Sequence, residues 1–431
     1  MTKDEIKNRI AEIKKRLKEV DLLLKNRDLK SFIYKIVINS AYGAVSSRMN
    51  PMGNDNLANA ITMMGSTSIQ QVNVITTKIV QDRAIREHFE HMKAAKAVLD
   101  SETSTDEEKR EAKQVCRNGK TEIMQLRDDV YCTTKVCTFN DTDSMGLSVA
   151  IIPVKLFDKS EGMVKITDEG YKMVAEVCEE INEQFRAWYN EVTNSHNCRL
   201  HFKREKICDI GIWLKKGGKS DEEARKNYVV RVIDNEGVKH FDGKYVKYTG
   251  VKLAKSVIPK PMKNAAKEIV WTMLDTQDRR KTDEKVKELY KVYCDMGVDD
   301  KAAIQRANGI ENKILHEDGL WYDKGTPGHI KAALNYNYMI KKLNLVRYTP
   351  IVSGDTYKIV HLKKGNKFGF EKMAYLEDWP KEFDEYMEID NIIGFNKLIY
   401  EEIKRFYKTV NWPAVNPTDN YEMSLLDILG I

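Results

Sequence analysis

Long hydrophobic runs are missing from this sequence of 431 residues. No apolar segment approaches the roughly 20 residues that a helix needs to cross a bilayer, and residues 1–7 include no apolar signal region. Paired cysteines are also missing, because the seven cysteines are scattered and none belongs to a Cys-x-x-Cys pair. These absences argue against a membrane protein, against export, and against a disulfide framework or a zinc ribbon. A reducing compartment fits best.

A strong excess of one charge is missing as well, since the sequence has 71 Lys and Arg against 65 Asp and Glu, which gives a net charge of +6. The distribution is uneven: residues 203–263 carry 16 Lys and Arg against 8 Asp and Glu. Such a stretch can be the footprint of a polyanion such as nucleic acid. A solvated surface is the commoner explanation of a charged run.

The sequence does contain clear helical patterns. From about residue 3 to residue 45, apolar residues recur at three- and four-residue steps, which predicts a long amphipathic helix. Residues 57–92 continue as helix. Residues 93–128 are highly charged, and Ser101-Glu-Thr-Ser-Thr-Asp106 is typical of a turn followed by an N-cap, so we expect an inserted helical hairpin there. A further helix is predicted over residues 165–192.

Strand patterns follow in two places. Residues 135–139 and 145–151 flank a polar turn and predict a first β-hairpin. Residues 228–241 predict a second hairpin that turns at 234–237, with a third strand near 245–251.

The last part of the chain is predicted to begin near Gly250, where we place a domain boundary. Residues 259–308 are mainly helical in pattern. The pattern is mixed beyond them, with a short strand pair near residues 357–362.

Asp141 and Asp143 are the first candidates for chemistry. They lie two positions apart at the first predicted hairpin turn, where side chains at i and i+2 point to the same side, so that both carboxylates can converge on one hard cation. A magnesium site needs this arrangement. The alternative is that the aspartates only favour the turn, through their own hydrogen bonds to the backbone.

The segment Lys35-Ile-Val-Ile-Asn39-Ser40-Ala-Tyr42-Gly43 lies upstream of this hairpin. Lys35, Asn39 and Tyr42 are spaced i, i+4, i+7, which places a cation, an amide and an aromatic ring on one helical stripe. Lys can pair with phosphate, the amide can bind phosphate or sugar, and Gly43 permits a close backbone approach. An ordinary amphipathic helix, with Tyr42 in the core and Lys35 in solvent, has the same spacing.

Taken together and in this order, the two motifs resemble the family B DNA polymerases of the T-even-phage type: Kx3NSxYG of the second fingers helix, then DTDS of the palm hairpin. Arg225-Lys-Asn-Tyr228 is similar to the family's KKRY segment, which holds the primer-template duplex. Residues 245–260 resemble the crossing from palm to thumb. The likeness continues through His329-Ile330, Tyr336-Asn337 and residues 364–369, so it covers nearly the whole chain.

The resemblance implies an α+β fold with three parts. Residues 1–47 would be the second fingers helix. Residues 48–250 would be the palm, an antiparallel sheet with helices, with the helical insertion at about 93–128. Residues 251–431 would be a mainly helical thumb with a C-terminal clamp-binding tail.

The resemblance also implies a reaction and the roles of residues. The reaction is template-directed addition of deoxynucleoside triphosphates to a primer 3′-hydroxyl, with two Mg2+ ions at the site. Asp143 would be the principal metal ligand, Asp141 the lesser one, and Glu205 a weaker candidate near the metals. The other implied contacts are with the incoming nucleotide (Lys35, Asn39, Ser40, Tyr42, Gly43 and Thr142), with primer-template DNA (Arg225, Lys226, Tyr228, Lys255 and Lys260) and with a sliding clamp (Leu425, Leu426, Ile428 and Leu429).

The clamp assignment depends on the apolar tail at residues 424–431. An apolar peptide at a free end has reason to be exposed only if it docks in a groove. A helix end folded back onto the thumb is the alternative.

Departures from the family pattern shape the expected mechanism. The sequence contains no segment like the family's first palm motif, an Asp followed by Ser-Leu-Tyr-Pro, and no exonuclease-like region. Asn227 replaces the arginine of KKRY, and the insertion at 93–128 has no counterpart. Because two Mg2+ ions need more carboxylates than one hairpin supplies, we expect the chain alone to be nearly inactive. It would work with an N-terminal polymerase subunit that carries the first palm motif and the exonuclease and packs on the apolar face of the opening helix.

Two other functions compete with this hypothesis. A non-catalytic DNA-binding and clamp-tethering protein, derived from a polymerase, would keep the palm and thumb, but it has no use for a carboxylate pair that repels DNA phosphates. A DxD glycosyltransferase would need a nucleotide-sugar fold pattern near the motif, which is lacking. The polymerase hypothesis predicts action in the cytoplasm of an infected bacterial cell, without a membrane partner.

Overall fold

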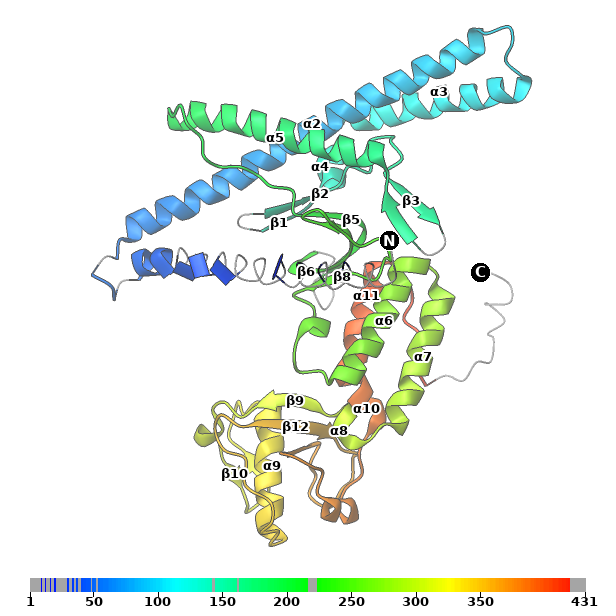
Figure 1. Ribbon diagram of the computed structural model, residues 1–431. Helices are drawn as coiled ribbons and strands as arrows, with labels where there is room; N and C mark the ends of the chain where they lie inside the picture. The colour runs from blue at the N-terminus through cyan, green and yellow to red at the C-terminus, as the bar shows by residue number, and fades with distance from the viewer. Residues whose placement is uncertain are drawn as a thin grey trace. The chain divides into compact units, whose positions relative to one another are not determined.

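The computed structural model describes most of the chain between residues 40 and 418 (Figure 1). The described residues are 40–47, 49–51, 53–141, 144–160, 163–215 and 223–418, with single positions at 9, 12, 16, 19, 20, 29, 30, 33, 34, 36 and 37. Only the backbone is described for Asp141 and residues 223–225. The chain divides into two compact units: Met1–Val154 with Met173–Phe202, and Lys155–Lys172 with Lys203–Ile431.

The first unit is built on a long helical hairpin of α2 (Asp55–Asp100) and α3 (Asp106–Leu126), drawn in blue and cyan in Figure 1. Helix α3 begins with a capping box, in which the Thr105 hydroxyl accepts from the Glu108 backbone N–H and the Glu108 carboxylate accepts from the Thr105 N–H. The predicted hairpin is therefore confirmed. Its first helix is not a separate element, because α2 runs through residue 93 without a break.

The first predicted β-hairpin follows in the same unit. Helix α4 (Asp129–Val136) leads into β1 (Cys137–Asp141), which pairs antiparallel with β2 (Ser144–Leu147). The predicted hairpin is thereby confirmed. The buried Gln81 amide of α2 donates to the Leu126 carbonyl at 2.7 Å and to the Asp129 carboxylate at 3.1 Å, which fixes the α3–α4 junction on α2.

The second unit begins with a sheet whose order is β5–β6–β7, with β8 also paired to β6. Its strands are antiparallel: β5 (Lys206–Lys215), β6 (Glu223–Asn235), β7 (Val238–Lys239) and β8 (Val246–Thr249). The second predicted hairpin and the third predicted strand are confirmed. Glu236 and Gly237 turn the hairpin with φ values of 52° and 93°, and the Gly237 N–H donates to the Asp234 carboxylate at 2.9 Å.

A hairpin and a long helix precede this sheet in the chain. A hairpin that the sequence patterns did not predict pairs β3 (Phe157–Ser160) with β4 (Met163–Ile166). The predicted helix over residues 165–192 is confirmed as α5 (Asp168–Thr193). Strand β5 was also not predicted, although it is the longest partner of β6.

Helices cover one face of this sheet. The core between them, which we call the sheet core, contains Ile212, Leu214 and Val229 from the strands. The helices that supply its other side are α6 (Lys260–Thr276), α7 (Arg279–Asp295) and α11 (Glu401–Thr409). Val251 and Leu253 belong to the same core, so the packing continues across Gly250.

A second core in this unit forms around α9 (Gly328–Lys342) and a three-stranded antiparallel sheet. The sheet has the order β13–β12–β9, with β9 (Ala303–Arg306), β12 (Thr356–His361) and β13 (Lys372–Tyr375). The strand pair predicted near residues 357–362 is instead the single strand β12 between two distant partners. The remaining short elements are η1 (Lys252–Ala254), α8 (Val298–Lys301), η2 (Ile310–Asn312), β10 (Leu315–His316), β11 (Trp321–Tyr322), η3 (Lys381–Glu385), α10 (Asn391–Phe395) and η4 (Asn396–Tyr400).

The structure is therefore a mixture of helices and antiparallel sheets, as the α+β prediction required. Among the described residues, no helix combines the length and the apolarity that crossing a membrane demands.

Candidate active site and nucleic-acid interface

The tip of the β1–β2 hairpin is the predicted metal site. The register ends with Asp141 opposite Ser144, and Phe139 lies opposite Gly146. A Cβ on Gly146 would collide with the Phe139 ring, so glycine leaves the room that this ring occupies. The side chain of Asp141, and Thr142 and Asp143 entirely, lie outside what the structure describes.

The base of the hairpin is anchored on α2. The Thr76 hydroxyl, which is fully buried, donates to the Met145 sulfur at 3.8 Å, and the Thr77 hydroxyl lies 3.5 Å from the Cys137 sulfur. These contacts fix both strands of the hairpin on α2. They thereby also fix the position of the end of β1, where Asp141 lies. The described residues contain no group of three His, Cys, Asp or Glu that could hold a metal ion. The predicted principal ligand Asp143 is not among those residues, so the metal site stays a prediction.

The predicted nucleotide-binding stripe is described in part. Ser40, Tyr42 and Gly43 lie in the helical segment 40–46, whereas Lys35 and Asn39 are outside the described residues. Tyr42 is 41% exposed, and its hydroxyl forms a 2.8 Å hydrogen bond with the Thr62 hydroxyl of α2. It is therefore not a core residue of this unit. A Cβ on Gly43 would meet nothing within 4 Å, so local packing does not require glycine there.

The segment that resembles KKRY coincides with an irregularity of β6. Trp213 of β5 pairs with Tyr228, and Lys215 pairs with Glu223, so that two steps along β5 face five steps along β6. The four residues 224–227, which lie opposite the single residue Leu214, form what we call the β6 bulge. Within it Lys226 has a φ of 58°, a left-handed conformation that is unfavourable for a side chain larger than glycine. Bulges and strained backbone of this kind are frequent at functional sites.

Gly250 closes the other side of the β6 bulge. It follows Thr249, which pairs with Tyr228 across β6 and β8. A Cβ on Gly250 would collide with the Lys226 carbonyl oxygen, and the φ of Gly250 is 67°. The left-handed Lys226 and the glycine opposite it thus depend on one another.

Replacing Gly250 with Ala tests this dependence. Gly237 is the matched control, because its φ is 93° but a Cβ there would meet nothing within 4 Å. We expect G237A to lower the free energy of unfolding by about 1–2 kcal/mol through left-handed strain alone, and G250A to lower it by clearly more. Urea unfolding of the two variants measures the difference. Equal losses would show that the β6 bulge does not depend on Gly250.

Three paired residues form a row across the sheet beside the β6 bulge. Tyr228 of β6 pairs with Trp213 of β5 on one side and with Thr249 of β8 on the other. The rings of Trp213 and Tyr228 are stacked, with centroids 6.4 Å apart and an interplanar angle of 28°. The Trp213 indole N–H and the Thr249 hydroxyl are buried without a hydrogen-bond partner in the part of the chain that the structure describes. Buried polar atoms of this kind call for a water or a ligand.

Trp213 was not predicted as a site residue, because strand β5 was not predicted. The signal was present, since Ile207, Ile212 and Leu214 are buried in a run rich in β-branched and apolar residues. The buried residues of this run do not alternate strictly with exposed ones, as they would in a half-buried strand, so the strand was not predicted.

The other predicted DNA contacts follow β8 along the chain. Lys255 is exposed after η1, and Lys260 is the exposed first residue of α6. The side chain of Arg225 is not described, whereas Lys226 is exposed.

The basic excess of residues 203–263 is smaller in the structure than in the sequence. Lys203 pairs with Glu236 at 3.2 Å, and Arg204 pairs with the fully buried Asp234 at 2.6 Å. Arg231 is 1% exposed and is bound by two carboxylates inside the unit. Glu205 pairs with Lys206 at 3.0 Å. These cations are therefore unsuited to hold a polyanion.

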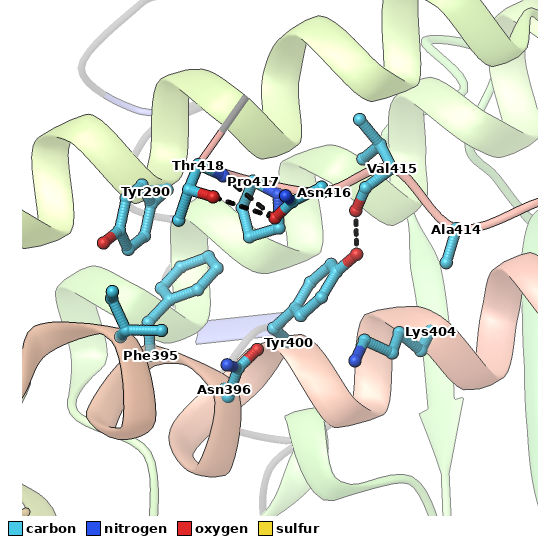
Figure 2. A pocket seen from close by; sticks show the side chains of 11 residues that line it. Tyr290, Phe395, Asn396, Tyr400, Lys404, Ala414, Val415, Asn416, Pro417 and Thr418 are labelled. Carbon is cyan, nitrogen blue, oxygen red and sulfur yellow. Dashed lines mark hydrogen bonds between the residues drawn. The ribbon is translucent and has the colours of Figure 1, made fainter. Parts of the chain in front are cut away.

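The segment before the predicted clamp-binding tail is held against the helices by an aromatic pocket. A cavity of about 450 Å3 is lined by residues that include Tyr290, Phe395 and Tyr400 (Figure 2). The Tyr400 hydroxyl donates to the Val415 carbonyl, and the Thr418 hydroxyl donates to the Asn416 side chain at 3.0 Å. The predicted clamp-binding residues Leu425, Leu426, Ile428 and Leu429 come after this segment and lie outside the described residues.

Comparison with known proteins gives a partial likeness. No protein-family model matches the chain. It is 26% identical over 258 residues to the DNA-directed DNA polymerase of Enterobacteria phage T4, which covers 57% of this chain and 27% of that protein. It is 26% identical over 156 residues to the DNA-directed DNA polymerase of Escherichia phage RB69, which covers 36% of this chain and 16% of that protein. The matches thus span about a quarter or less of these relatives, and they support a function related to DNA polymerases.

Proposed function

We propose that this chain forms the DNA-gripping surface and one part of the catalytic site of a family B DNA-directed DNA polymerase. The observation that carries the proposal is the β6 bulge, because the segment that resembles the duplex-holding KKRY motif is the place where β6 leaves regular pairing and Lys226 becomes left-handed against Gly250. The partial likeness to two phage polymerases supports it.

In the proposed reaction, the primer 3′-hydroxyl attacks the α-phosphate of a deoxynucleoside triphosphate, and pyrophosphate leaves. Asp143 and Asp141 would hold Mg2+, which supplies charge stabilisation at the attacking and leaving oxygens. The anchored β1–β2 hairpin fits this role, because strand β1 ends at Asp141 and residues 141–144 at the turn carry only carboxylate and hydroxyl side chains. Lys35 and Asn39 would bind the triphosphate, and Tyr42 would contact the new base pair.

The proposed site is completed by a polypeptide segment that carries the first palm motif, since the 431 residues include none that resembles it. Primer extension tests this. We expect no extension with Mg2+, the four deoxynucleotides and this chain alone. We expect extension when an N-terminal polymerase segment that carries the first palm motif is added. Extension by this chain alone would reveal a further carboxylate here. No extension under either condition would favour a DNA-binding and clamp-tethering role.

The proposed grip on DNA predicts a salt dependence. Phosphate contacts release counterions, so each contact contributes about 0.9 to the slope of log K against log salt. We expect the double variant Arg225→Ala, Lys226→Ala to weaken duplex binding and to reduce the slope by up to about two such contributions. Fluorescence anisotropy with a primer-template duplex between low and moderate salt measures both quantities.

Lys203→Ala is the matched control, because Lys203 lies in the same basic run but pairs with Glu236. It should leave the slope unchanged. An equal loss of slope in the control and in the double variant would contradict the assignment of the β6 bulge to DNA.

A further inference from the structure

A small basic cavity lies in the second unit, away from the β6 bulge in sequence. It has a volume of about 190 Å3, and strands β9 and β12 line it together with residues of η1, α10 and η4. Its basic side chains are four lysines and two histidines, Tyr293 also lines it, and there is no Asp or Glu among the described residues that line it. The basic side chains are Lys252, Lys301, Lys372, Lys397, His329 and His361.

Three of these lysines have no carboxylate within ion-pair distance in the described part of the chain. Lys252 donates to the Lys397 carbonyl at 2.6 Å. Lys301 is only 9% exposed, and it donates to the Cys294 carbonyl at 3.4 Å. Lys372 extends toward Gly328, where a Cβ would lie 3.1 Å from its ammonium nitrogen. Only Lys397 is paired, with Glu401 at 2.6 Å.

This arrangement is electrostatically costly. Burial lowers the pKa of Lys252 and of Lys301, because their charged ammonium groups lose water. The carboxylates that raise these pKa values, Glu401 and Glu402 for Lys252 and Asp295 for Lys301, offset the burial only in part. Burying a charge without a partner is among the most destabilising features of a fold. Lys397 and Lys255 also lower the pKa of Lys252, so an anion in the cavity would relieve both the burial and the repulsion.

The histidines are suited to the same ligand. The pKa of His361 is lowered to about 4, mainly by burial and also by the charges of Lys372 and Lys397, whereas Asp390 and Glu401 raise it. Burial also lowers the pKa of His329. Both imidazoles are therefore neutral near pH 7, where each can donate one N–H to an anion.

We propose that this cavity binds a phosphate group. Lysine ammonium groups and imidazole N–H groups are donors that phosphate oxygens accept strongly. The volume corresponds to on the order of six water molecules, which accommodates phosphate or pyrophosphate but not a nucleotide. The source is either a free phosphate or the backbone of a bound nucleic acid. The proposal stands on the cavity alone and does not depend on the polymerase function.

Thermal unfolding of the full chain tests the proposal with phosphate, pyrophosphate and a short DNA duplex as separate additions. We expect at least one of them to raise the Tm of the unaltered chain. Lys372→Met and Lys301→Met should each weaken the binding about tenfold or more, as expected for loss of a charge-assisted contact. Lys301→Met should also raise the Tm without any anion, because it removes a buried unpaired charge.

Lys363→Met is the control, since Lys363 lies in the same part of the chain but is exposed and paired with Glu388. A nuclear magnetic resonance titration of His361 gives an independent readout, because its pKa should rise from about 4 when the anion binds. A shift from phosphate or pyrophosphate identifies a free anion, and a shift from duplex alone, lost in Lys372→Met, identifies backbone phosphate. No shift with any addition, or equal shifts in Lys372→Met and Lys363→Met, would overturn the proposal.

Discussion

Replacing Asp143 with Ala should reduce primer extension on the order of 10³-fold or more in the reaction completed by the N-terminal polymerase segment. Loss of a metal-ligand carboxylate removes several kcal/mol of transition-state stabilisation, and each 1.36 kcal/mol is about tenfold in rate. Asp141→Ala should cost less, because Asp141 is the lesser ligand in the proposed site. Single-turnover extension at saturating deoxynucleotide measures both.

The control for this prediction is Asp158→Ala, on the neighbouring β3–β4 hairpin in sequence. Asp158 forms a surface ion pair with Lys155, and such pairs contribute little to stability. Its extension rate should match that of the unaltered chain. An Asp143→Ala variant that keeps its rate within tenfold, with an unchanged circular dichroism spectrum, would exclude the β1–β2 hairpin as the metal site.

The features that the sequence predicted correctly depend on local chemistry. The 234–237 turn is defined by residues that bond within four positions, since the Gly237 N–H donates to Asp234. The α3 N-terminus is defined in the same way by Thr105 and Glu108. Short-range hydrogen bonds of this kind leave a readable pattern in the sequence.

The features that the sequence did not predict depend on distant partners. Strand β5 contains register shifts near Cys208 and again after Trp213, which break the alternation that reveals a strand. Strand β12 pairs with β9, about fifty positions earlier, as well as with β13. No local pattern reports such pairings.

The candidate site shows the same division. The motifs at 141–143 and 225–228 are visible in the sequence, but the close contact between Lys226 and Gly250 requires the pairing of β6 with β8. The basic run was overestimated for the same reason, because the carboxylates that neutralise Arg204 and Arg231 come from other strands and from α6.

Arg231 is the residue whose loss should destabilise the second unit most. It is 1% exposed on β6, and its guanidinium donates to both oxygens of Asp209, at 2.9 and 2.5 Å, and to Asp275 at 2.6 Å. The hydrogen bonds that Arg231 donates to Asp209 are the main reason why the pKa of Arg231 lies above its usual value. The Asp209 side chain is also 1% exposed, whereas Asp275 is 33% exposed.

Arg231→Met should lower the free energy of unfolding by about 3–5 kcal/mol, because it leaves the buried Asp209 carboxylate with only the more distant Lys159, at 4.0 Å, as a counterion. Adding Asp209→Leu to this variant should recover much of the loss, since the double variant removes both charges and leaves the more exposed Asp275 to solvent. Lys203→Met, which breaks an exposed pair, should change the free energy by less than about 1 kcal/mol. Urea unfolding followed by circular dichroism measures all three.

The double variant decides between two explanations of the buried pair. If it is as stable as the unaltered chain, the charges contribute little net stability, and their value lies in orienting β6 against α6. In that case duplex binding should weaken in the double variant although the fold is intact, because the same strand carries the β6 bulge at its other end. If the double variant is as unstable as Arg231→Met alone, the loss comes from packing rather than from an unpaired charge, and the electrostatic explanation is wrong.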